Sequence, residues 1–192
     1  MQGSDLTPWL QRLKEGDKEA FRYVYDRTVD NVYRTVALLV SGRQDIEDIM
    51  NEIYFKLWLS LPNYDPNRPF RNWLHGIAIR QVQDWRRRKW RKFRLFERQK
   101  MLEIQPEHPR TDRVIVWNET TRELLELLNH LSYKLRIVVV LRYYHEYSLT
   151  EISELLAVPI GTVKSRHHQA LKELRKHSVE LDLEKGGDCF VH

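Results

Sequence analysis

The chain has 192 residues, of which 42% are hydrophobic and 31% are charged, and its formal net charge is +5. This length suits one domain or two small ones, and the positive charge favours a polyanionic partner, either a nucleic acid or a membrane surface. The single cysteine, Cys189, excludes a disulfide framework, and we find neither a signal-peptide core nor an apolar run that could span a bilayer, so we expect a cytoplasmic protein.

Most of the chain repeats apolar residues at helical spacing, as in the stripe of Ile46, Ile49, Ile53 and Leu57. No alternating segment is long enough to indicate a sheet. The segment 61–70, LPNYDPNRPF, contains three prolines and predicts a loop, after which a helix is expected from about Phe70 to Arg94. The sequence therefore predicts an all-α fold.

An acidic helix is expected at DIEDIMNEIYFKLW, residues 45–58, where Asp45, Asp48 and Glu52 share one helical face. Carboxylates at this spacing can bind a metal, but the motif pairs no histidine with them. A solvated helix face and a docking surface for a basic partner protein are the two other interpretations, and the sequence alone leaves them open.

A strongly basic stretch follows at QDWRRRKWRKFR, residues 83–94, where seven of the nine residues from 86 to 94 are lysine or arginine. Such cations bind phosphates, and the interleaved Trp85, Trp90 and Phe93 offer stacking surfaces for unpaired bases. A solvated helix face and an anionic membrane are the alternatives. We favour nucleic acid, and the polar loop before this helix is a candidate to receive a flipped base.

Composition changes after the basic stretch, because the segment EIQPEHPRTDR, residues 103–113, combines two prolines with mixed charge and little to bury. We therefore predict two small helical domains joined by a flexible linker and followed by a frayed tail. The predicted segments are a first domain (1–94), the linker (95–116), a second domain (117–178) and the tail (179–192).

The second domain contains SLTEISELLAVPIGTVKSRHHQALKELRK, residues 148–176, which has helix-turn-helix form. Ser148 or Thr150 can cap a short first helix, residues 157–160 make the turn, and Thr162 can cap or open the second helix. The start of that second helix would face the major groove of DNA, unless it is only a solvated face of a plain bundle. The outward-facing residues there are Thr162, Lys164, Ser165, Arg166, His168 and Gln169.

The order of these motifs resembles the extracytoplasmic-function (ECF) group of bacterial sigma factors, the dissociable initiation subunits of RNA polymerase. Three stretches carry the resemblance, which extends from about Leu10 to His177: DIEDIMNEIYFKLW, FRNWLHGIAIRQVQDWRRR and YSLTEISELLAVPIGTVKSRHHQALKELR. The sequence departs from the family at Asn51, where glutamine is usual, and at His167 and His168, which replace commoner apolar, aromatic or basic residues.

The resemblance implies three interfaces and their residues. Docking on the clamp helices of the largest polymerase subunit would use Asp48, Asn51, Glu52, Lys56 and Trp58. Recognition and melting of the minus-ten promoter element would use Asn63, Asn72, Trp73, Arg80, Gln83, Asp84, Arg87 and Arg88. Recognition of the minus-thirty-five element would use Thr162, Lys164, Ser165, Arg166 and His168, in a domain that also docks on the polymerase flap.

The resemblance further implies a protein that is a monomer when free, takes no cofactor, metal or small-molecule substrate, and performs no catalysis itself. Its partners would be core RNA polymerase, promoter DNA and an anti-sigma factor, which can hold such a protein at the membrane. Two other classes are weighed against this one: a stand-alone helix-turn-helix regulator, which would commonly be a dimer, and a nucleic-acid enzyme, which would need a metal cluster in a pocket.

Overall fold

The computed structural model describes residues 6–99 and 119–187, and every regular element within those two ranges is helical. The chain divides into two compact units, residues 1–112 and 113–192. The all-α fold with two helical domains is therefore confirmed. Within the described ranges, no helix is both long enough and apolar enough to cross a bilayer.

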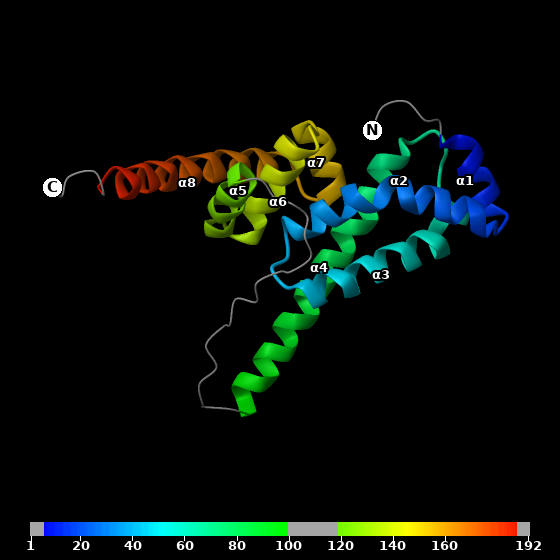
Figure 1. Cartoon of the computed structure of the whole chain (residues 1–192), viewed down its shortest axis with the longest axis horizontal. Coiled ribbons are helices and arrows are strands. Elements are labelled where there is room, and N and C mark those ends of the chain that lie inside the picture. Colours follow the sequence, from blue (N-terminus) through cyan, green and yellow to red (C-terminus); the bar gives the residue numbers. More distant parts are fainter. Residues whose placement is uncertain (1–5, 100–118, 188–192) are drawn as a thin grey trace. The chain divides into compact units, whose positions relative to one another are not determined.

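Over residues 6–99, the first unit consists of four α-helices and a short 3₁₀ turn (Figure 1). Asp17 caps α2, since its side chain accepts hydrogen bonds from the backbone N–H groups of Glu19 and Ala20 at 2.8 and 3.2 Å. These contacts and the neighbouring Arg12 lower the pKa of Asp17. The elements are α1 (Thr7–Lys14), α2 (Lys18–Ala37), α3 (Arg43–Ser60), η1 (Leu61–Asn63) and α4 (Phe70–Gln99).

The core of this unit lies where α2, α3 and α4 pack together. The predicted stripe of Ile46, Ile49, Ile53 and Leu57 is almost completely buried, which confirms the helical period read from the sequence. The same burial fixes the rotation of α3 about its axis. The remaining face of α3, which carries the predicted docking residues, is thereby turned outward.

Helix α4 is longer than the sequence predicted, because it continues past Arg94 to Gln99. Residues 95–99, LFERQ, contain neither glycine nor proline, so nothing local ends the helix there. The start of the predicted linker is thus helical. The rest of that linker lies outside the described residues.

The second unit holds the helix-turn-helix, formed by α7 and α8. Ser148, one of the two cap candidates that the sequence offered, caps α7 in a reciprocal capping box with Glu151. Ala157 ends α7 in the left-handed region with φ of 52°. The elements are α5 (Glu119–His130), α6 (Tyr133–Val139), the π-helical turn η2 (Val140–Tyr144), α7 (Leu149–Leu156) and α8 (Ile160–Gly187).

The sequence left open whether Thr162 caps or opens the second helix of the motif. Helix α8 begins at Ile160, so Thr162 lies inside its first turn and donates its backbone N–H to the Pro159 carbonyl at 2.9 Å instead of capping the helix. Proline before the first residue starts the helix earlier than a threonine cap would, because its fixed φ suits a helix N-terminus. The predicted frayed tail is instead helical as far as Gly187, whereas Cys189 lies outside the described residues.

Candidate nucleic-acid and partner-binding surfaces

An aromatic groove runs between α2 and α3 on the first unit. It encloses about 540 Å³ and is lined by Lys18, Phe21, Tyr25, Met50, Asn51, Tyr54, Phe55 and Trp58. The ring of Phe21 meets that of Trp58 edge-on at 5.6 Å between centroids, and Tyr25 and Tyr54 are 4.6 Å apart. Exposed aromatic rings at a hollow of this kind are typical of a protein-binding surface.

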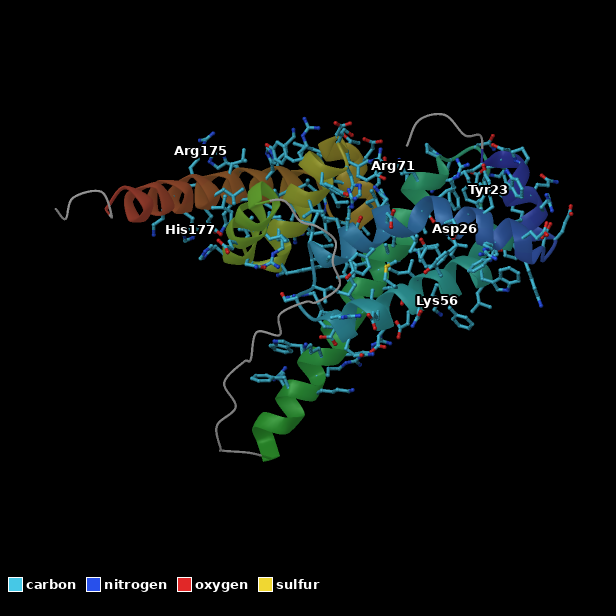
Figure 2. The ribbon with its side chains drawn as sticks, in the orientation of Figure 1. Tyr23, Asp26, Lys56, Arg71, Arg175 and His177 are labelled. Carbon is cyan, nitrogen blue, oxygen red and sulfur yellow. The ribbon has the colours of Figure 1, made fainter. Side chains whose placement is uncertain are left out.

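The predicted docking residues divide between this groove and the surface beside it. Asn51 and Trp58 line the groove, while Asp48 and Lys56 are exposed outside it. Figure 2 labels Lys56 on α3. The sequence analysis missed Phe21 and Tyr25, which α2 contributes. Their spacing of four residues was the only available signal, because a second helix joins a surface only through tertiary packing.

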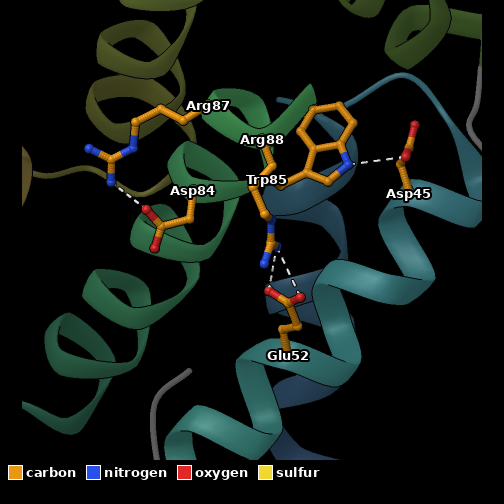
Figure 3. A network of polar contacts seen from close by, with 6 residues as sticks. All are labelled: Asp45, Glu52, Asp84, Trp85, Arg87 and Arg88. Atoms are coloured by element: carbon orange, nitrogen blue, oxygen red, sulfur yellow. Dashed lines mark hydrogen bonds and ion pairs between the residues drawn. The ribbon is translucent and has the colours of Figure 1, made fainter. Parts of the chain in front are cut away.

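A polar network connects α3 to α4 (Figure 3). Both carboxylate oxygens of Glu52 accept hydrogen bonds from Arg88, at 2.9 and 2.7 Å, and this contact raises the pKa of the Arg88 guanidinium. Asp45 accepts from the indole N–H of Trp85 at 3.0 Å and from Lys89 at 2.9 Å. We call these five residues the α3–α4 clasp.

The clasp brings together residues that the sequence analysis placed at different interfaces. Glu52 was predicted to face a protein partner and Arg88 to face DNA, yet each is the other's partner in this chain. No cluster of three or more metal-binding side chains occurs in the described part of the chain. Three carboxylates were considered as possible metal ligands. Two of them, Asp45 and Glu52, form ion pairs with cations of α4 instead.

Contacts from α1 hold the loop between η1 and α4 in place. Lys14 of α1 donates to the backbone carbonyl of Tyr64 at 3.0 Å, and its ammonium lies 5.7 Å from the centre of that ring. The Tyr64 hydroxyl donates to the carbonyl of Arg68 at 2.7 Å, and its ring contacts Trp73 at 4.8 Å between centroids. The sequence analysis missed Lys14, since no local pattern connects it to a loop 50 residues away.

Replacement of Lys14 by methionine should therefore loosen this loop without unfolding the domain. One hydrogen bond from a charged group at a partly exposed site contributes about 1 kcal/mol, so we expect about a five-fold loss in any function that needs the loop ordered. For the minus-ten role that the resemblance implies, fluorescence of 2-aminopurine placed in the minus-ten element of a promoter would measure strand opening. Arg22→Met, which removes an exposed cation from α2, is the matched control and should leave opening and thermal stability unchanged.

The predicted minus-ten residues occupy the loop and one face of α4. Asn63 is exposed at the end of η1, and Asn72 and Trp73 are half-buried in the first turn of α4. Arg80, Gln83, Asp84 and Arg87 recur at helical spacing and share a face, along which Arg87 pairs with Asp84. Arg88 is rotated away from that face by about 100°, toward α3.

The helix-turn-helix presents the start of α8. Val163 and Ala170 are fully buried, and Lys164, Ser165 and His168 are exposed, while Thr162 and Arg166 are half-buried. The predicted minus-thirty-five residues therefore lie on or beside an accessible surface at the N-terminal end of α8. Ser165 donates its hydroxyl to the Thr162 carbonyl at 3.0 Å.

A neighbouring contact was not predicted. The hydroxyl of Tyr143, in η2, is 3.0 Å from Nε2 of His167, and burial, with nearby Arg142 and His168, lowers the pKa of His167. The lowered pKa favours the neutral form of His167, while the adjacent His168 remains on the exposed face.

Comparison with known proteins identifies both units. The family model for sigma-70 region 2 matches residues 24–92, and the model for sigma-70 region 4 matches residues 121–174. The chain is 30% identical over 179 residues to the ECF RNA polymerase sigma factor SigW of Bacillus subtilis (strain 168), covering 90% of this chain and 96% of that protein. It is 27% identical over 168 residues to SigX of the same organism, covering 83% of this chain and 84% of that protein.

Solved structures share the fold. The structure of CnrH in complex with the cytosolic domain of CnrY matches with a TM-score of 0.63 and 21% identity, covering 93% of this chain and 98% of that one. The sigma factor RpoE from Bartonella quintana, in complex with the anti-sigma factor NepR, matches with a TM-score of 0.64 and 19% identity, covering 81% and 94% of the two chains.

Proposed function

Since this chain belongs to the ECF group of RNA polymerase sigma factors, we propose that it binds core RNA polymerase and directs promoter-specific transcription initiation. The observation that carries this proposal is that region 2 and region 4 occur in one chain, in this order. A stand-alone helix-turn-helix regulator would account for the second unit and leave the first, with its aromatic groove, without a role.

The groove between α2 and α3 is the proposed docking site for the clamp helices of the largest polymerase subunit. Aromatic side chains in a partly desolvated hollow supply most of the binding energy at protein interfaces, and Trp58 and Asn51 already belonged to the predicted docking set. Asp48, Glu52 and Lys56 would form the polar rim, where charge guides orientation more than it adds affinity.

The loop after η1 and the outer face of α4 are the proposed minus-ten surface. Asn63, Asn72 and Trp73 lie near the loop that would receive an extruded base, and the cations of α4 would hold phosphates. Unstacking costs a few kcal/mol per base step, which stacking on aromatic rings and release of counterions offset. No covalent chemistry is assigned to this chain, because the polymerase makes the bonds.

The start of α8 is the proposed reader of the minus-thirty-five element. Arg166 can pair bidentately with guanine, whereas Lys164, Ser165 and Thr162 suit phosphates or mixed contacts. His168 shares the exposed surface, and the same domain would dock on the polymerase flap. We further propose cytoplasmic action as a monomer, and control by an anti-sigma factor, in keeping with the complexes of the structural relatives.

Run-off transcription tests this function directly. Core polymerase that lacks any initiation factor is mixed with sheared genomic DNA of the source organism, with and without this chain. Discrete transcripts that appear only with the chain are expected, and their 5′ ends give its promoters. A chain that yields no transcripts and does not co-purify with core polymerase would instead be a stand-alone regulator, and a symmetric footprint on duplex DNA would identify it as one.

A further inference from the structure

The predicted minus-ten face of α4 does not end at Arg87. Trp90, Arg91 and Arg94 continue the stripe that Arg80, Gln83, Asp84 and Arg87 begin, since they recur three, four and seven residues after Arg87. All three are exposed, Trp90 at 61%, and the Arg94 guanidinium lies 4.9 Å from the centre of the Trp90 ring. A shallow hollow on this face is lined by Asp84, Arg86, Arg87, Trp90 and Arg91.

The α3–α4 clasp explains why this face is the outer one. Trp85, Arg88 and Lys89 are held to the carboxylates of α3, which turns the opposite side of α4 to solvent. Beyond the clasp, the last turns of α4 extend past α3 as a single helix (Figure 1). This distal segment is fixed in direction by the clasp and presents its stripe without cover from α3.

The charge of the distal stripe of α4, Arg87, Trp90, Arg91 and Arg94, indicates which class of partner it binds. Asp84 is the last acidic residue before Glu97, so three arginines, Arg87, Arg91 and Arg94, follow one another along the face without an intervening carboxylate. Cations spaced along a helix suit a phosphate backbone. A membrane would require a broad apolar face, whereas this one carries a single large apolar ring among its cations.

We propose that the distal stripe of α4, Arg87, Trp90, Arg91 and Arg94, binds the phosphate backbone of the duplex spacer between the two promoter elements. This inference rests on the proposed function. Arg80 and Arg94 are 14 residues apart, which is about 21 Å along the helix, or roughly six base pairs at about 3.4 Å each. The loop that would receive an extruded base precedes the N-terminal end of α4, so the distal stripe lies at the end of α4 farther from that loop, where the DNA would still be duplex.

Two DNA probes from a promoter found by run-off transcription test the proposal. One is a fork with duplex DNA from the minus-thirty-five element to the start of the minus-ten element and a single-stranded minus-ten overhang. The other is the single-stranded minus-ten oligonucleotide alone. Fluorescence anisotropy gives the Kd of holoenzyme containing wild-type chain, Arg91→Ala, or the double variant Arg91→Ala/Arg94→Ala, at several salt concentrations.

For Arg91→Ala we expect about three- to five-fold weaker binding to the fork and a salt slope smaller by about 1, with the second substitution lowering the slope by about 1 more. Binding to the oligonucleotide should not change. Lys92→Ala is the matched control, because it removes the same charge from the face of α4 that carries Trp85 and Lys89, and it should behave as wild type on both probes.

The contradicting outcomes are distinct. Unchanged fork affinity and slope in the double variant would overturn the spacer contact, as would an equal loss on both probes, which would place these arginines in polymerase binding. A wild-type holoenzyme that binds neither probe better than core polymerase would remove the proposed function, and this inference with it.

Discussion

Val163→Asp is expected to unfold the second domain and abolish use of the minus-thirty-five element, while the first domain stays folded. Val163 is fully buried on α8, which packs on α7. No lysine or arginine is among the buried side chains of the described residues, so a carboxylate there would lack a cationic partner of that kind, and burial of an unpaired charge costs at least about 4 kcal/mol. That is a large part of the total stability of a small domain, about 5 to 15 kcal/mol.

Thermal unfolding followed by circular dichroism measures this effect. We expect the variant to lose the helical signal of the second domain at room temperature and to keep a cooperative transition from the first. Lys164→Asp introduces the same carboxylate at the neighbouring exposed position and should leave the melting curve close to wild type. Equal melting of Val163→Asp and wild type would show that the buried position of α8 is wrong.

The helical fold could be predicted from local sequence features, namely apolar spacing and helix caps. The spacing of Ile46, Ile49, Ile53 and Leu57 shows both the helix and its buried face, and Ser148, one of the two predicted cap candidates, marks the start of α7. The ends of α4 and α8 were harder to predict. Composition distinguishes a solvated helix from a linker poorly when neither glycine nor proline interrupts it.

The candidate surfaces were only partly predictable, for a different physical reason. Resemblance to a family nominated Glu52 and Arg88, yet their mutual contact joins residues 36 positions apart and depends on how α3 packs on α4. The contact of Lys14 with the loop carbonyl depends in the same way on where α1 lies. Tertiary contacts of this kind leave no periodic trace in the sequence, so the structure alone reveals them.

Replacement of Trp58 by alanine is expected to be the most damaging single change at the proposed polymerase interface. Trp58 lines the groove, and its ring packs edge-on against Phe21 of α2, so the substitution removes part of the groove wall as well as a contact surface. A buried tryptophan at a protein interface contributes at least about 2 kcal/mol, which corresponds to about a 30-fold weaker Kd for core polymerase.

Leu59→Ala is the matched control, because Leu59 is the next residue along α3, is 53% exposed compared with 38% for Trp58, and does not line the groove. Titration of labelled chain with core polymerase should give a wild-type Kd for this variant and the weakened Kd for Trp58→Ala. Equal losses would mean that α3 docks through its whole exposed face, and no loss in either would move the docking site away from the groove. A selective loss at Trp58 would assign polymerase binding to the aromatic hollow shared by α2 and α3, with the carboxylates beside it left to guide orientation as a polar rim.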